Sequence, residues 1–233
     1  RQMCIRDRSV SELSTSTQNY LKAIWGLKEW SSEPVTATLI SAHLGLKLSS
    51  VSDAVRKMTK QGLVSHTPYG AVELTDRGRQ YALDMVRRHR LLESFLVQAL
   101  DYTWDEVHDE AENLEHAVSD MLIERVDKFL NFPSRDPHGD PIPTVDGNIT
   151  IPRAHRLSDS GAQTQVIVER ISDSDPQLLA FLKEHGIVTG AVLDTREGAP
   201  FSESLEVRVF GSAPWVLLGR PATDAVFVAP HTP

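Results

Sequence analysis

The stretch Thr36–Leu74, TATLISAHLGLKLSSVSDAVRKMTKQGLVSHTPYGAVEL, decides the fold of the N-terminal part of the chain. Apolar residues recur at helical spacing over Thr36–Leu44 and again over Ser49–Lys60, and Gly45 begins the short turn between them. We expect two helices joined by this turn, with Ser49 as the N-cap of the second. The buried face of the second helix is expected to hold Val51, Val55 and Met58.

Further elements flank these two helices on both sides. A helix is predicted before them, over Ser16–Trp30, from the spacing of its apolar residues. After them, Leu63–Thr67 and Ala71–Leu74 alternate around Pro68-Tyr69-Gly70, which indicates a hairpin. Helix, turn, helix and hairpin in this order are typical of a winged helix-turn-helix, a fold that binds double-stranded DNA.

The second helix of that motif would carry the contacts to DNA. Its small polar residues would face base edges, and its basic residues would neutralise phosphates. The expected DNA-binding residues are Lys47, Ser49, Ser50, Ser52, Asp53, Arg56, Lys57 and Lys60. A small pair of helices with a polar outer face would show the same pattern without binding DNA, and the added hairpin favours DNA binding.

The distribution of charge supports a basic DNA-binding front. The net charge is −8, but Arg1–Leu91 holds fourteen Lys and Arg against eight Asp and Glu, whereas Leu92–Pro233 holds ten against twenty-four. A basic N-terminal part suggests a polyanion as partner, and an acidic C-terminal part suggests a cation. The single cysteine, Cys4, excludes an intramolecular disulfide framework. Neither a membrane span nor a signal segment is found, so we expect a cytoplasmic protein.

The pattern divides the chain into four parts. We expect a winged helix-turn-helix domain at residues 9–81, metal-binding and dimerisation helices at 82–145, a linker at 146–161 and a small SH3-like β-barrel at 162–233. The stretch Phe132–Gly161 carries five prolines, a composition that favours a linker or packed loop. One helix, Pro176–His185, interrupts the last part. Its expected strands are Gln165–Ile171, Ala191–Arg196, Leu205–Phe210, Trp215–Leu218 and Ala225–Val228.

The acidic middle of the chain has the spacing of a metal site. His89 and Glu93 are four residues apart on one predicted helix. On a helix beginning near Trp104, His108, Glu112, Glu115 and His116 would share one stripe. Burying these groups unpaired would be costly, whereas a divalent cation would compensate for their desolvation. A solvated acidic face is the alternative. Mixed nitrogen and oxygen donors suit Mn²⁺, Fe²⁺, Co²⁺, Ni²⁺ or Zn²⁺, and the spacing does not choose among them.

Four segments in order resemble one known family. They are Arg88–Glu93, Val107–Glu112, Leu114–Asp120 and Gly139–Pro143. Together they are similar to the metal-dependent repressors of the diphtheria toxin repressor family, which has iron-responsive and manganese-responsive branches. The similarity runs from about Ser14 to Pro143, and the C-terminal part is weakly similar to the FeoA-like domain of longer members. The resemblance implies homodimers that bind palindromic operator DNA when they are loaded with metal.

The resemblance also implies two metal sites per subunit. An ancillary site would use His89, Glu93 and His108, and a primary site would use Asn19, Glu112, Glu115 and His116. The iron-responsive pattern has Met at the position of Asn19 and Cys at that of Glu112. Glu112 matches the manganese-responsive pattern, which usually has Asp where Asn19 stands. In longer members the last domain can add ligands to the ancillary site, and Glu169 and Asp173 fall near those positions.

We therefore expect a repressor of metal-uptake genes that is activated by Mn²⁺ and is not an enzyme. The same family with Fe²⁺ as effector is the alternative. A metallohydrolase is a distant one, because the sequence shows no nucleophile motif or phosphate loop. A metal-buffering module that does not bind DNA is also open. Near the expected ligands, an apolar set is predicted to form a two-fold interface: Leu114, Val118, Met121, Leu122, Val126 and Leu130.

Overall fold

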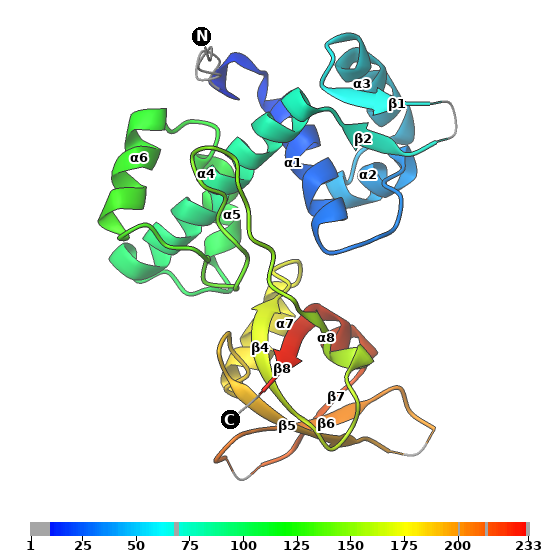
Figure 1. Ribbon diagram of the computed structural model, residues 1–233, viewed down its shortest axis with the longest axis vertical. Coiled ribbons are helices and arrows are strands. Elements are labelled where there is room, and N and C mark those ends of the chain that lie inside the picture. The colour runs from blue at the N-terminus through cyan, green and yellow to red at the C-terminus, as the bar shows by residue number, and fades with distance from the viewer. Residues whose placement is uncertain (1–9, 68–69, 200, 213, 232–233) are drawn as a thin grey trace. The chain divides into compact units, whose positions relative to one another are not determined.

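The computed structural model describes residues 10–67, 70–199, 201–212 and 214–231 (Figure 1). It contains two compact units, each built from separate stretches of the chain. The first unit comprises Arg1–His89, Leu114–Arg125 and Pro143–Asn148. The second unit comprises Arg90–Asn113, Val126–Ile142 and Ile149–Pro233. No helix among the described residues is long and apolar enough to cross a membrane.

Helices dominate up to residue 129, and strands dominate after residue 155. The helical part contains η1 (Val10–Glu12), α1 (Thr15–Glu29), α2 (Ala37–Leu44), α3 (Leu48–Lys60), β1 (Val64–His66), β2 (Val72–Leu74), α4 (Asp76–Leu100), α5 (Val107–Leu114) and α6 (Asp120–Phe129). The remainder contains β3 (His155–Arg156), η2 (Leu157–Asp159), β4 (Gln165–Ile171), α7 (Pro176–Glu184), β5 (Val192–Glu197), β6 (Leu205–Val209), β7 (Val216–Leu218), α8 (Arg220–Ala225) and β8 (Val226–Pro230).

Side-chain caps begin the first two helices. The hydroxyl of Ser14 accepts a hydrogen bond from the amide of Thr17, and that of Thr36 accepts one from the amide of Leu39. These bonds satisfy amides that have no partner within the helix. Gly45 ends α2 in the left-handed conformation, with φ of 64°. The predicted order of helix, turn and helix is confirmed.

The start of α3 differs from the prediction. The helix begins at Leu48, and its N-cap Lys47 makes no side-chain capping bond, so the prediction that Ser49 is the cap is wrong. Ser49 lies inside the first turn instead. The hairpin is confirmed, since β1 and β2 pair antiparallel with Ser65 opposite Glu73. Pro68 and Tyr69 of the predicted turn lie outside the described residues.

The core of the first unit holds α1, α3 and the hairpin against the start of α4. Val51, Val55 and Met58 are buried there, as predicted. A close approach fixes the hairpin against α4, because a side chain at Gly78 would lie 1.9 Å from the carbonyl oxygen of Leu63. α1 is therefore packed into the DNA-binding part of the unit, and its position is tied to that of α3.

The acidic helix of the middle segment ends earlier than predicted. α5 stops at Leu114, and Glu115 and His116 lie in the turn that follows it. The prediction that both share one helical stripe with His108 and Glu112 is therefore wrong. The next helix, α6, begins after Ser119, whose hydroxyl accepts a hydrogen bond from the amide of Leu122. The chain must leave α5 before that new start.

The second unit contains an antiparallel sheet with the strand order β3-β8-β4-β5-β6-β7. Leu157, Ile171, Leu179 and Leu182 are fully buried in its core. The predicted strands are present, but the prediction of a closed barrel is wrong for the described residues, since β3 and β7 are the two ends of an open sheet. The segment after β7 forms α8 instead of a pairing strand.

Two short elements of this unit were not predicted. β3 is only two residues long, too short to show an alternating pattern. α8 begins at Arg220, directly after Gly219 and before Pro221. Pro221 is compatible with the first turn of a helix, because the amide that proline lacks has no partner there.

Candidate metal centres and DNA-binding surface

A group of polar side chains in the first unit surrounds the buried carboxylate of Glu115, which is 0% exposed. α1, α4 and the turn after α5 contribute to it. We call this group the Glu115 cluster, and its members are Gln18, Lys22, His89, Glu115 and His116. Three of its five members are expected metal ligands, while Gln18 and Lys22 were missed by the sequence analysis. Asn19, a fourth expected ligand, follows Gln18 on α1.

Gln18 fixes the proton of His116. Its side-chain amide donates to the backbone oxygens of Val10 (2.9 Å) and Leu13 (3.0 Å), so its own oxygen must face away from them. That oxygen lies 2.6 Å from Nδ1 of His116 and accepts its hydrogen. The other ring nitrogen, Nε2, lies 3.4 Å from Oε1 of Glu115. A nitrogen of His116 and an oxygen of Glu115 thus lie close together, and Gln18 holds the imidazole ring in place from its other nitrogen.

His89 is held in the same way by Glu115 itself. Nδ1 of His89 lies 2.7 Å from Oε2 of Glu115 and donates its hydrogen to that oxygen. The other ring nitrogen, Nε2, keeps its lone pair in this tautomer. A carboxylate that accepts from one nitrogen of an imidazole makes the second nitrogen a better ligand for a metal.

Lys22 brings a positive charge to the cluster. Its ammonium lies 2.7 Å from Oε1 and 2.9 Å from Oε2 of Glu115. A buried carboxylate needs such a partner, because its desolvation is otherwise uncompensated. The signal in the sequence was the spacing of Lys22 three residues after Asn19, which places both on one face of α1.

Asn19 provides a test of whether a metal fits this cluster. Its Oδ1 is buried and accepts no hydrogen bond from the residues that the structure describes. An amide oxygen without a partner is costly in a protein interior and is a ligand type that hard cations accept. The residues present therefore fit a divalent cation.

A second group of titratable side chains lies in the second unit around Glu93, which is also 0% exposed. Nδ1 of His108 lies 3.4 Å from Oε1 of Glu93 and 3.1 Å from Oδ2 of Asp173. Possible ligand atoms of these three residues lie within 4.8 Å of one another. We call the full group the Glu93 cluster. Its members are Glu93, His108, Asp136, His138 and Asp173.

His138 and Asp136 were missed by the sequence analysis, which assigned neither of them to a site. Nε2 of His138 donates to the carbonyl oxygen of Trp104 (2.7 Å), and the two rings stack. Nδ1 of His138 is buried without a hydrogen-bond partner among the described residues and lies 3.9 Å from Oε2 of Glu93. A buried ring nitrogen beside a carboxylate either carries a proton or binds a cation in its place. The run Asp136-Pro-His138-Gly-Asp140 was the available signal.

Protons balance the charges of the Glu93 cluster. Hydrogen bonds to Asp173 and Glu93 raise the pKa of His108 to about 10. Burial opposes the charged form of His138, but the carboxylate of Glu93 outweighs burial and raises its pKa to about 9. Burial raises the pKa of Asp136 well above its usual range, and the neighbouring carboxylates of Asp140 and Glu93 add to the effect. A metal that binds the imidazoles must displace their protons, so metal affinity at this cluster rises with pH.

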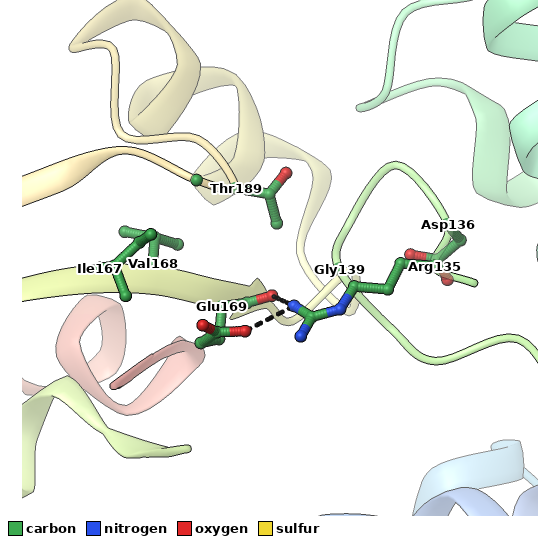
Figure 2. A pocket seen from close by; sticks show the side chains of 8 residues that line it. Arg135, Asp136, Gly139, Ile167, Val168, Glu169 and Thr189 are labelled. Atoms are coloured by element: carbon green, nitrogen blue, oxygen red, sulfur yellow. Dashed lines mark hydrogen bonds and ion pairs between the residues drawn. The ribbon is translucent and has the colours of Figure 1, made fainter. Parts of the chain in front are cut away.

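The Asp136–Asp140 loop is seated directly on β4 of the second unit. A side chain at Gly139 would lie 2.1 Å from the backbone oxygen of Glu169. A pocket of about 390 Å³ opens beside this contact (Figure 2). In it, Arg135 donates to the carboxylate of Glu169 over 2.6 Å. The structure therefore pairs Glu169 with an arginine, whereas Asp173 lies in the Glu93 cluster. Glu112 lies on α5, one turn after His108.

The expected DNA-contacting residues lie along the outer side of α3. All are exposed except Ser52, which is half-buried and donates to the carbonyl oxygen of Leu48. Arg56 forms an exposed ion pair with Asp53 at 2.9 Å. Lys57 and Lys60 extend from the last turn of the helix. This surface combines small hydroxyls with positive charge, which suits contact with base edges and phosphates.

Three family models match the chain in order. Residues 12–72 match "Iron dependent repressor, N-terminal DNA binding domain", residues 75–144 match "Iron dependent repressor, metal binding and dimerisation domain", and residues 155–230 match "FeoA domain". The "Iron-dependent repressor IdeR" of Mycobacterium leprae is 32% identical over 194 residues, which cover 78% of this chain and 84% of that protein. The chain belongs to the diphtheria toxin repressor family.

Solved structures of this repressor family extend the comparison over nearly the whole chain. A "Manganese-dependent transcriptional repressor complex with manganese" is 47% identical and has a TM-score of 0.87, covering 92% of this chain and 100% of its own. The "manganese regulator SloR" is 31% identical with a TM-score of 0.76, covering 92% of this chain and 98% of its own. The protein is accordingly a metal-dependent transcriptional repressor of the diphtheria toxin repressor family. Its DNA-binding and dimerisation domains indicate DNA and a second copy of the chain as partners.

Proposed function

We propose that this protein represses metal-uptake genes when Mn²⁺ binds to both clusters. The observation that carries the proposal is the chemistry of the donors. The two clusters offer carboxylates, imidazoles and one amide oxygen, and no thiolate or thioether of a described residue belongs to either. Hard oxygen donors suit Mn²⁺, whereas thiolates favour softer ions. The solved relative described as manganese-dependent, 47% identical, supports this choice.

One Mn²⁺ would be held in the Glu93 cluster. Glu93, His108, Asp173 and His138 are the proposed ligands, with Asp136 beside them. This set keeps Glu93 and His108 of the expected ancillary site, retains Asp173 and leaves out Glu169, which is paired with Arg135. Four such donors supply two carboxylates and two imidazoles, a mixture that Mn²⁺ accepts.

A second Mn²⁺ would be held in the Glu115 cluster. Glu115 and His116 direct an oxygen and a nitrogen to one place, and Asn19 adds its amide oxygen from α1. Glu112 is the fourth ligand proposed from the sequence. The ion would tie α1 to the turn after α5. Because α1 shares a core with α3, the ion would stabilise one position of the DNA-binding helix. It shifts the population toward the DNA-binding state by its difference in affinity for the two states.

The repressor is proposed to bind palindromic operator DNA as a two-fold dimer. A gel-shift experiment with promoter DNA, run with Mn²⁺ and with a chelator, tests the function as a whole. A shift that requires Mn²⁺ is expected. DNA binding that is equal with Mn²⁺ and with the chelator would contradict the proposal. Metal binding without any DNA shift would favour the metal-buffering alternative.

The basic residues of α3 are expected to contact phosphates rather than bases. Replacing Arg56, Lys57 or Lys60 by alanine should weaken binding to operator and to unrelated DNA alike. Each loss should also make the dependence of log affinity on log salt shallower by about one unit. Fluorescence anisotropy over a salt series measures both. An unchanged slope for all three variants would remove these residues from the interface.

α6 is expected to provide the dimer interface. Met121 is 64% exposed and Leu122 is 45% exposed, so both apolar side chains are available to a partner. Met121→Asp should raise the dimer dissociation constant more than about tenfold, because it places a charge in an apolar contact. Sedimentation with Mn²⁺ present measures the change. Leu217→Asp, at an exposed apolar residue of β7, is the matched control, and equal effects of the two variants would contradict the assignment.

A further inference from the structure

Lys22 occupies the side of Glu115 on which the proposed ligand atoms meet. Its ammonium is 2.7 Å from Oε1 of Glu115, and Nε2 of His116 is 3.4 Å from the same oxygen. It also lies 3.5 Å from Nδ1 of His89. One tethered cation therefore contacts the groups that would receive a metal.

The charge of this site is already balanced without metal. Glu115 is fully buried, and the Lys22 side chain is 17% exposed, so the ion pair is largely shielded from solvent. A divalent ion that added itself to this pair would bring two positive charges next to the ammonium. Repulsion between like charges at such short distance is strong where solvent is excluded. The metal must therefore displace the ammonium from Glu115.

The geometry allows that displacement. The ammonium is carried by a flexible four-carbon stem, and part of the side chain reaches solvent. Meanwhile Oδ1 of Asn19, three residues earlier on α1, is buried without a hydrogen-bond partner among the described residues. This oxygen would be a further donor on α1 for a metal that replaced the ammonium. The flexible stem of Lys22 gives the ammonium a way to leave.

We propose that Lys22 is an intramolecular competitor that sets the concentration of metal needed to load the Glu115 cluster. This inference rests on the proposed function, in which Glu115 ligates the ion. In the absence of metal, Lys22 stabilises the buried carboxylate and ties α1 to the turn after α5. At sufficient metal concentration the divalent ion replaces it, and the ammonium moves to solvent.

The proposal predicts opposite effects of one substitution on stability and on affinity. Lys22→Met removes the competing charge but leaves Glu115 buried and uncompensated. The metal-free protein should unfold at a lower temperature than the wild type. Its affinity for Mn²⁺ at the Glu115 cluster should rise by about tenfold to a hundredfold, the strength expected for a charge-assisted contact that no longer competes. If Lys22 had only a structural role, Lys22→Met would lower both the unfolding temperature and the affinity for Mn²⁺.

The experiment titrates Mn²⁺ alone into the full-length protein after chelator treatment and follows free Mn²⁺ by electron paramagnetic resonance. Thermal unfolding in chelator is measured in parallel. Lys28→Met is the matched control, since Lys28 lies on the same helix, is exposed, and donates to backbone oxygens after α1. Lys22→Gln, which keeps a hydrogen-bond donor for Glu115, serves if the Met variant does not fold.

The Glu115→Gln variant distinguishes failure of the Lys22 proposal from failure of the proposed metal site. If it loses one Mn²⁺ site while Lys22→Met and Lys22→Gln leave the affinity of that site unchanged or weaker, Lys22 is not a competitor and the proposed site stands. If Glu115→Gln binds Mn²⁺ as the wild type does, the proposed site itself is wrong. Tighter binding by the Lys22 variants, with Lys28→Met unchanged, supports the inference.

Discussion

Glu93→Gln is expected to abolish metal binding at the Glu93 cluster. The substitution keeps the size of the side chain but removes the buried charge that faces both His108 and His138. Outer partners of metal ligands alone contribute about 10–100-fold to affinity, so loss of the central ligand should weaken this site by more than about 100-fold. Titration of Mn²⁺ followed by calorimetry should show one site per subunit fewer than in the wild type.

Glu169→Gln is the matched control for that prediction. Glu169 is a carboxylate of the same unit that was also considered a ligand, but it is bound to Arg135. Its substitution should leave both Mn²⁺ sites intact. If Glu169→Gln removes a site and Glu93→Gln does not, the assignment of the ligands in this unit is wrong.

The second large effect concerns the identity of the metal. Replacing Glu112 by cysteine together with Asn19 by methionine should shift activation of DNA binding from Mn²⁺ toward Fe²⁺ or Co²⁺. The substitutions exchange two hard oxygen donors for a soft thiolate and a soft thioether. Because Mn²⁺ lies low in the affinity series of divalent ions, the wild type must favour it through geometry and coordination number rather than binding strength. Zn²⁺ is expected to bind the wild type tightly and activate it poorly.

DNA affinity measured at buffered concentrations of each ion tests this prediction. The double variant should respond to Fe²⁺ at lower concentration than to Mn²⁺, with the order reversed in the wild type. A wild type that is activated by Fe²⁺ and indifferent to Mn²⁺ would place the protein with the iron-dependent relatives named by the comparison.

Local patterns were sufficient to predict the order of elements in the DNA-binding part, but not the cap of α3. Ser14 and Thr36 cap their helices, and Gly45 ends α2, because each acts on backbone groups a few residues away. β4 has the predicted bounds, Gln165–Ile171, and its burial alternates from Gln165 to Arg170. Such signals do not depend on the rest of the fold. They did not locate the end of α5 at Leu114, after which the chain turns before α6 begins at Asp120.

The metal clusters depend on contacts that the sequence does not display. His138 approaches Glu93 from 45 positions along the chain, and Lys22 approaches Glu115 from 93. No periodicity links such pairs. The Asp136–Asp140 loop shows no periodic pattern in the sequence, yet two backbone amides bond to Oδ1 of Asp136 and turn the loop inward. Residue types and spacing suggested a metal site, while the ligand sets required the structure.

The most direct test of the whole account is the affinity of the wild-type dimer for its promoter DNA at controlled free Mn²⁺. Fluorescence anisotropy with a labelled promoter fragment should show tight binding that develops as Mn²⁺ rises and disappears when a chelator is added. Glu115→Gln should bind the same fragment weakly at every Mn²⁺ concentration. Equal DNA affinity of the wild type in chelator and in Mn²⁺ would contradict the claim that metal at these clusters controls repression.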